Sequence, residues 1–160
     1  MEKAVSEAAD QLVESRIAEG ENLKRDLFSK LDHMLQVVED VEHRSPEVLS
    51  AYRERLYQKV HELLEDTMIE ESRLTTEIVI YADKICVDEE TVRLKSHMKS
   101  LREALEEGDG VGRKLDFLTQ EMNREANTIL SKANDMEISN LAIELKTEIE
   151  KIREQIQNIE

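Results

Sequence analysis

The sequence has little of what interrupts helices or fills β-sheets: one proline, four glycines, no tryptophan and only 3% aromatic residues. Strands favour aromatic and β-branched residues in alternation, and no run here alternates as a strand should. Hydrophobic residues make up 39% and charged residues 37%, which suits helices with a core of Leu, Ile, Val and Met. These shortages predict an all-α protein.

A second shortage is cysteine. The single one, Cys86, excludes a disulfide within the chain, which fits a reducing compartment such as the cytoplasm. Its neighbours Ile85 and Val87 are apolar, so we expect a buried thiol. No apolar run approaches the ~18 residues of a spanning helix, so no membrane partner is expected.

Basic residues are also scarce relative to acidic ones. There are 22 Lys and Arg against 37 Asp and Glu, which gives a formal net charge of −15. This balance argues against a broad basic surface for nucleic acid. It favours solubility and the binding of cations.

Apolar residues recur every three or four positions along most of the chain, which predicts about six long amphipathic helices in an extended bundle. The first stripe ends at the motif RSPE, where Ser45 is expected to cap a second helix with Pro46 at its first position. Asp88 is expected to cap the fourth helix, and the glycine-rich EGDGVG to end it. The last helix has the clearest stripe, from Ile138 to Ile159.

We expect two parts, a long helical hairpin over residues 1–70 and a C-terminal helical domain over residues 71–160. Their boundary is uncertain, because residues 65–72 contain no strong helix breaker. The apolar stripes of such long helices need partners to cover them. The chain is therefore expected to associate with copies of itself.

The stretch GRKLDFLTQEMNREANTI mixes both charge signs with asparagines, which are poor helix formers. Positions three and four apart share one face of a helix. The polar face predicted in this way contains Arg113, Asp116, Gln120, Arg124 and Asn127, and the stripe beside it contains Phe117, Glu121 and Glu125. Two explanations stay open: surface ion pairs worth about 0.3–0.5 kcal/mol each, or a face that binds a ligand or another subunit.

A resemblance to the YicC/YloC-like endoribonuclease family is carried by the segment VGRKLDFLTQEMNREANTILSKANDMEISNLAIELKTEIEKIREQIQNIE. It continues upstream through DKICVDEETVRLKSHMKSLREAL, and SRIAEGENLKRDL is similar to the family's R-x-x-EG-x-x-L segment. Family members are nearly twice as long and begin with a β-containing domain, so the resemblance implies a C-terminal helical fragment. It also implies a metal-dependent endoribonuclease that assembles into rings, which would be hexamers in the full-length protein.

The implied chemistry directs attention to particular side chains. RNA cleavage needs an activated nucleophile, neutralised phosphate charge and a proton for the leaving oxygen, and a divalent ion, Mn²⁺ or Mg²⁺, can supply the first two. Glu121 and Glu125 lie one helical turn apart, a spacing at which two carboxylates can share one ion. We therefore predict His97, Glu121 and Glu125 as catalytic, and the same three with Asp116 as metal ligands.

Four basic residues are predicted to bind RNA phosphates: Arg113, Lys114, Arg124 and Lys132. The alternative is that they form ion pairs with acids nearby in the fold. In that case the chain would be a non-catalytic helical module for oligomerisation and interaction. The two alternatives differ in whether Asp116, Glu121 and Glu125 converge with His97.

Overall fold

The computed structural model describes residues 2–63, 71–108 and 111–157, and these form five helices and no strand. The helices are α1 (Glu2–Leu63), α2 (Glu71–Ile85), α3 (Asp88–Glu107), α4 (Gly112–Lys132) and α5 (Met136–Ile156). The all-α prediction is confirmed, with five helices in the described ranges where about six were expected.

The difference arises at Pro46, where α1 continues as one helix and the predicted break is absent. Ser45 does not cap a new helix, because its hydroxyl donates a hydrogen bond of 2.8 Å to the carbonyl of Val41. Pro46 lacks the N–H that would bond the carbonyl of Glu42. The helix continues because apolar side chains on both sides of the proline, Val41 and Val48, pack at the core.

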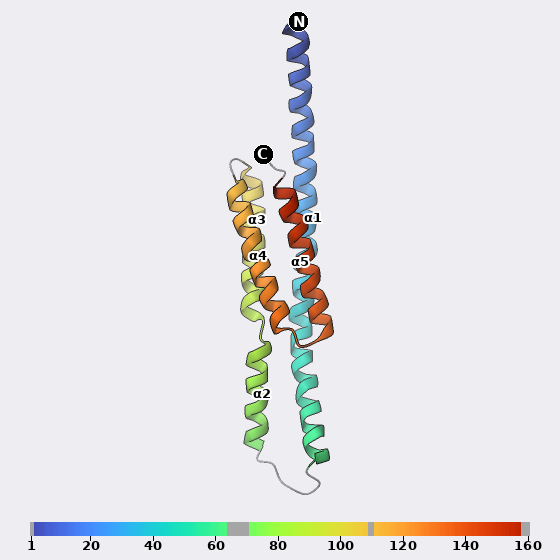
Figure 1. Cartoon of the computed structure of the whole chain (residues 1–160), viewed down its shortest axis with the longest axis vertical. Coiled ribbons are helices and arrows are strands. Elements are labelled where there is room, and N and C mark those ends of the chain that lie inside the picture. The colour runs from blue at the N-terminus through green and yellow to red at the C-terminus, as the bar shows by residue number, and fades with distance from the viewer. Residues whose placement is uncertain (1, 64–70, 109–110, 158–160) are drawn as a thin grey trace.

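The N-terminal part is accordingly one helix, and the hairpin predicted over residues 1–70 is wrong as a description of it. With 62 residues, α1 is about 93 Å long. After it the chain reverses, and α2 runs back beside the end of α1 (Figure 1). The uncertain boundary in residues 65–72 falls largely outside the described residues.

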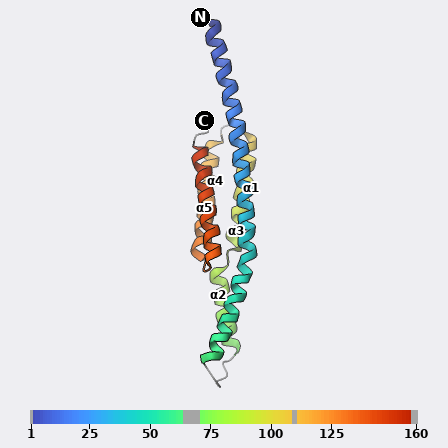
Figure 2. The ribbon, with the colours of Figure 1, turned by 90° about the vertical axis from the view of Figure 1, so that its right-hand side faces the viewer.

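The middle of α1 packs with α3, α4 and α5 as a four-helix bundle in which neighbouring helices run antiparallel (Figure 1, Figure 2). α3 and α5 each contact both α1 and α4, an arrangement typical of up-down-up-down bundles. The core is aliphatic, as predicted. Its largest fully buried side chains are Leu27, Leu31, Met34, Leu94, Met98, Leu101, Leu115, Met122, Ile129, Leu145, Ile149 and Ile152.

A two-helix arm continues from one end of the bundle. We define the arm as α2 together with α1 residues 47–63, and it has no fully buried residue in α2. The ring of Tyr81 stacks on that of Tyr52, with centroids 3.5 Å apart. Asn134, in the turn between α4 and α5, donates a hydrogen bond of 3.0 Å to the Tyr81 hydroxyl. The arm therefore contacts the bundle mainly at its base.

At the opposite end, α1 extends beyond its partners (Figure 1). We name residues 6–22 the projection, and each of them is exposed. Three apolar side chains of the projection, Leu12, Val13 and Ile17, are 61%, 57% and 62% exposed. These side chains have no cover within the described part of one chain.

Asp135 fixes the turn between α4 and α5. Its Oδ1 accepts hydrogen bonds of 3.1 Å from the backbone N–H groups of Glu137 and Ile138, so it is the N-cap of α5. Arg44 of α1 donates hydrogen bonds of 3.2 and 3.0 Å to the same carboxylate. These bonds from Arg44 are the main reason that the pKa of Asp135 lies below its usual value.

Two predictions at the start of α3 were wrong. The N-cap position is Val87 and not Asp88, because Asp88 already lies within the helix, where its carbonyl accepts a 3.1 Å hydrogen bond from Thr91. Cys86 is exposed rather than buried. The chain leaves the helical path at these two residues, so only Val87, 2% exposed, turns into the core.

Candidate nucleic-acid interface

The stretch GRKLDFLTQEMNREANTI, which mixes charged and amide side chains, lies in α4. The side of α4 that faces the core is the side predicted from the sequence. The buried apolar residues are Leu115, Leu118, Met122, Ala126 and Ile129. They recur at steps of three and four, so the other sides of the helix are left for polar residues. Of the site residues predicted on α4, Glu125 is buried, and the others lie on those other sides.

The side opposite the core is a row of exposed residues that we name the outer strip: Arg113, Phe117, Gln120, Arg124 and Asn127. Arg124 is 76% exposed at its side chain and Phe117 is 58% exposed. Arg113 makes no ion pair or hydrogen bond with its side chain among the residues described. The strip contains no acid, so it is a positively charged row on an acidic protein.

Asp116 was expected on this outer face, but it turns toward α5. Its Oδ1 lies 3.6 Å from Nε of Arg153, and its Oδ2 accepts a hydrogen bond of 2.8 Å from Gln120. The pairing with α5 holds the carboxylate at the edge of the outer strip. Among the described residues, the side chain of Arg113 has no acid paired with it, and Arg124 has only Glu121, at 4.0 Å.

Glu125 faces α3 and is only 5% exposed. Arg93 of α3 lies 3.7 Å from its carboxylate. Arg93 also binds Glu89, and the hydrogen bond to Glu89 is the main reason that the pKa of Arg93 is raised. The pairing between Arg93 and Glu125 could not be predicted from the sequence, because it depends on how α3 packs on α4.

Two of the four predicted phosphate-binding residues already have partners within the chain. Lys132 donates hydrogen bonds of 2.7 Å to Glu90 and 2.9 Å to the carbonyl of Cys86. Lys114 lies 3.2 Å from a carboxylate oxygen of Glu107. The ion-pair alternative therefore holds for these two lysines, whereas Arg113 and Arg124 stay available.

Glu121 borders the outer strip and is 29% exposed. Its one ion-pair contact among the described residues is with Arg124, at 4.0 Å. His97 is half-buried on α3 and forms no hydrogen bond or ion pair with any described residue. Glu121 is thus the predicted catalytic carboxylate that lies beside the exposed Arg124 of the outer strip.

The predicted metal ligands are not brought together within one chain. Among the described residues, no three His, Cys, Asp or Glu side chains lie close enough to hold a metal ion. The reason is the packing: Asp116 turns toward α5 and Glu125 toward α3, on opposite sides of α4. The described residues of one chain therefore do not fit a metal ion.

A shallow groove of about 510 Å³ runs between α4 and α5 next to the outer strip. Asn123 lines it from α4 and accepts a long hydrogen bond of 3.5 Å from Asn127 of the strip. Lys146 lines it from α5 and forms no ion pair in the described part of the chain. Sequence reasoning missed Lys146, because only the packing of α5 on α4 brings it near this helix.

The fold and the outer strip define a class: a helical-bundle domain with an exposed row of arginine, aromatic and amide side chains suited to a polyanion. In the part of the chain that the structure describes, no helix has the length and apolar character that crossing a membrane would require.

Comparison with known proteins identifies the family. Residues 41–160 match the family described as endoribonuclease YicC-like, C-terminal. The chain is 48% identical over 161 residues to a protein of Clostridioides difficile (strain 630) named probable endoribonuclease YicC, across 100% of this chain and 55% of the relative. A Haemophilus influenzae (strain ATCC 51907 / DSM 11121 / KW20 / Rd) protein of the same name is 40% identical over 157 residues, across 96% of this chain and 54% of its own length.

The chain belongs to the YicC-like endoribonuclease family, as the sequence resemblance implied. It spans about half the length of the curated relatives it matches. The Clostridioides difficile relative also matches the part of α1 that precedes residue 41. The likeness therefore extends over the projection as well as over the bundle.

Proposed function

We propose that this chain is the helical part of an RNA-cleaving enzyme and that RNA binds along the outer strip of α4. The observation that carries the proposal is the pair of exposed arginines, Arg113 and Arg124, in a chain with a net charge of −15. Most cations near α4 are held by acids at 3.7 Å or less, whereas the closest acid to Arg124 is 4.0 Å away. The names of the two relatives support an RNA substrate.

The strip offers each kind of contact that single-stranded RNA uses. Arg113 and Arg124 are about 16 Å apart along the helix, so they can grip separate phosphates with their planar guanidinium groups. Phe117 lies between them and presents a ring on which a base can stack, a contact worth about 1–3 kcal/mol. Gln120 and Asn127 can hydrogen-bond to base edges that are free in unpaired RNA.

We further propose that Glu121 takes part in cleavage. Its carboxylate would accept the proton of a ribose 2′-hydroxyl as that oxygen attacks the phosphorus and the bond to the 5′-oxygen breaks. Arg124, beside it, would balance the charge that develops on the phosphate oxygens. His97 is retained as the predicted donor of the proton that the departing 5′-oxygen requires, whereas Glu125 suits this chemistry less because it is buried against Arg93.

Dependence on Mn²⁺ or Mg²⁺ stays within the proposal as a property of the assembled enzyme. Such ions take several oxygen ligands, and the described residues of one chain supply no group of three candidates. Asp116 and Glu121 are the predicted ligands that keep exposed carboxylate surface. Further ligands would have to come from RNA phosphates or from another chain.

A second function, helical assembly, is favoured by the uncovered apolar residues of the projection. We also propose that copies of this chain associate and that the full-length protein forms a hexameric ring. The two functions are compatible, because the projection and the outer strip lie on different parts of the molecule. Light scattering at micromolar concentration distinguishes a monomer from an assembly.

Cleavage is tested with Glu121→Gln, which removes the carboxylate charge at nearly constant size. We expect this chain, or the full-length Clostridioides difficile relative with the equivalent change, to lose about 10²-fold or more of its cleavage rate. The assay follows a labelled single-stranded RNA with added Mn²⁺, with added Mg²⁺ and with a chelator. The matched control is Glu106→Gln, an exposed acid on α3, and equal rates for the two folded variants would contradict the role of Glu121.

A further inference from the structure

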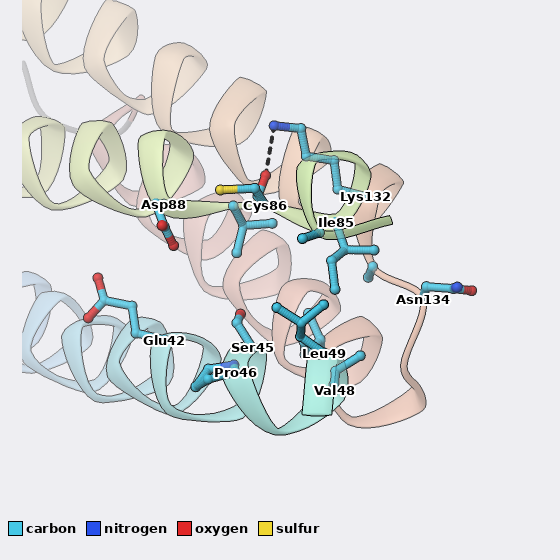
Figure 3. Close-up of a pocket in the computed structure, with 14 residues that line it drawn as sticks. Glu42, Ser45, Pro46, Val48, Leu49, Ile85, Cys86, Asp88, Lys132 and Asn134 are labelled. Atoms are coloured by element: carbon cyan, nitrogen blue, oxygen red, sulfur yellow. Dashed lines mark hydrogen bonds between the residues drawn. The ribbon is translucent and has the colours of Figure 1, made fainter. Parts of the chain in front are cut away.

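A pocket of about 280 Å³ lies where the arm meets the bundle (Figure 3). Its walls come from α1 on both sides of Pro46, from the end of α2 and its link to α3, and from the turn between α4 and α5. Segments far apart in the sequence thus enclose one space. Ligand sites in proteins are commonly apolar cavities with a few polar groups, and the volume here suits a small molecule.

One end of the pocket is apolar. Val48 and Leu49 of α1 face Ile85 of α2 across it (Figure 3), and Ile138 of α5 completes the lining. Val48 and Ile85 are only partly buried, so the cavity keeps apolar surface in contact with water. A hydrocarbon or aromatic group that displaced this water would be favoured, because its own apolar surface and that of the pocket would leave water.

The other end carries negative charge. The carboxylates of Glu42 and Asp88, from α1 and α3, lie at the same end of the pocket (Figure 3). Lys95 neutralises Glu42 through a hydrogen bond of 2.6 Å. Asp88 forms no ion pair with its side chain in the described part of the chain. The backbone carbonyl of Glu42 is a further acceptor. It lacks its helical N–H donor because residue 46 is a proline.

The one basic residue in the lining does not offset this charge. Lys132 directs its ammonium to the carbonyl of Cys86, as Figure 3 shows, and to the carboxylate of Glu90. Glu90 is 6% exposed and its second carboxylate oxygen is buried with no hydrogen-bond partner in the described residues. The charge of Lys132 is therefore needed by Glu90, and the pocket keeps an excess of acceptors and negative charge.

We propose that this pocket binds a small organic cation, a primary amine or guanidinium carried on an apolar stem. The stem would lie against Val48, Leu49 and Ile85, and the charged group would lie between the carboxylate of Asp88 and the acceptors of Glu42. A small anion is disfavoured by the same carboxylates. The pocket is separate from the outer strip, so a test of ligand binding in the pocket does not depend on whether the strip binds RNA.

Binding would also hold the arm to the bundle. The arm's base contributes Leu49 and Ile85, whereas Asp88 and Ile138 belong to the bundle helices. A ligand that contacts both parts stabilises the conformation it binds. Amide hydrogen exchange in α2 should therefore slow when the ligand is present.

The probe is pentylamine, titrated into the ¹⁵N-labelled chain while backbone amide shifts are followed. We expect saturable shifts at pocket residues and slower exchange in α2. The neutral analogue 1-pentanol should bind roughly fivefold more weakly, the ratio for an ion pair worth about 1 kcal/mol at a partly exposed site. Pentanoate should bind more weakly still.

Asp88→Asn tests the charge, with Glu89→Gln as the matched control, since Glu89 is the next acid along and is held by Arg93. We expect Asp88→Asn to weaken pentylamine binding roughly fivefold and Glu89→Gln to leave it nearly unchanged. Ala133 also lines the pocket, so Ala133→Leu, which puts a larger side chain into this space, should abolish binding, with folding checked by circular dichroism. The proposal is overturned if 1-pentanol binds as tightly as pentylamine, if the two charge variants weaken binding equally, or if Ala133→Leu still binds.

Discussion

The bundle and the arm are built from helices of the same amphipathic kind, yet they differ in what covers them. Among the α1 residues whose burial the structure describes, every buried apolar one lies between Leu27 and Val41, in the helix that α3 and α5 contact. Beyond Pro46 the same helix has only α2 beside most of its length, and α2 buries none of its residues. The periodic pattern of apolar residues is present in both regions, so it does not explain why one is buried and the other is not. The difference in burial follows the number of neighbouring helices.

The difference in burial between the bundle and the arm is tested most strongly by truncating the same residue type in each region. Ile149 is 0% exposed in the bundle, and Ile80 is 58% exposed in the arm. Ile149→Ala should lower the free energy of unfolding by about 3 kcal/mol, because it leaves a cavity in a packed core. Ile80→Ala should change it by less than about 0.5 kcal/mol.

Urea denaturation followed by circular dichroism measures both changes. Equal losses for the two variants would mean that the arm has a packed core of its own, contrary to the burial described here.

The junction between the two regions is tested next by Pro46→Ala. Alanine supplies the N–H that the carbonyl of Glu42 lacks, and it has a far higher helix propensity than proline. We expect the variant to gain about 1–2 kcal/mol in unfolding free energy, less than the full helix-interior difference because proline also restricts the unfolded chain. A thermal melt detects the gain, and an unchanged or lower midpoint would show that α1 is not continuous at this residue in solution.

A smaller effect is expected at Asp135, where the turn between α4 and α5 meets α1. Asp135→Ala should cost about 1 kcal/mol by removing the N-cap of α5. Asp135→Asn should cost less, because asparagine caps as well as aspartate. The change removes the charge and one of the two hydrogen bonds that Arg44 donates, since an amide nitrogen cannot accept.

The same residue gives a pH dependence whose sign follows from its lowered pKa. A carboxylate with a pKa below its unfolded value of 3.8 stabilises the fold above that value, and the stabilisation is lost as the pH falls through the folded pKa. The difference in unfolding free energy between wild type and Asp135→Asn should therefore be constant near neutral pH and shrink below about pH 4. A difference that grew on acidification would contradict the interaction with Arg44.

Much of this fold could be predicted from the spacing of apolar residues, because that spacing reports which side of a helix is buried. The core side of α4 and the stripe of α5 were read correctly in this way. Pro46 was misread because its local signal for a helix start is real, but packing on both sides of it decides the outcome. Cys86 was misread because its neighbours are apolar, whereas the chain path at this point turns only Val87 inward.

The candidate site was predictable only in part, for a related reason. Helical spacing placed Arg113 and Arg124 on one exposed face, and the structure agrees. The partners of Glu125 and Asp116 are Arg93 and Arg153, which lie on other helices. Spacing within one helix carries no information about such pairs, because they depend on which helices are neighbours and on their register.

The central claim, that the outer strip of α4 is the RNA-binding surface, is tested most directly by the salt dependence of RNA affinity. Arg124→Gln removes a cation of the strip whose side chain is 76% exposed, and Lys99→Gln is the matched control, because Lys99 is 78% exposed on α3. Each phosphate contact to a single strand contributes about 0.7 to the slope of log K against log salt concentration. We predict that Arg124→Gln lowers the slope for a single-stranded RNA by about 0.7 and that Lys99→Gln leaves it unchanged; equal slopes for wild type and Arg124→Gln would contradict the claim.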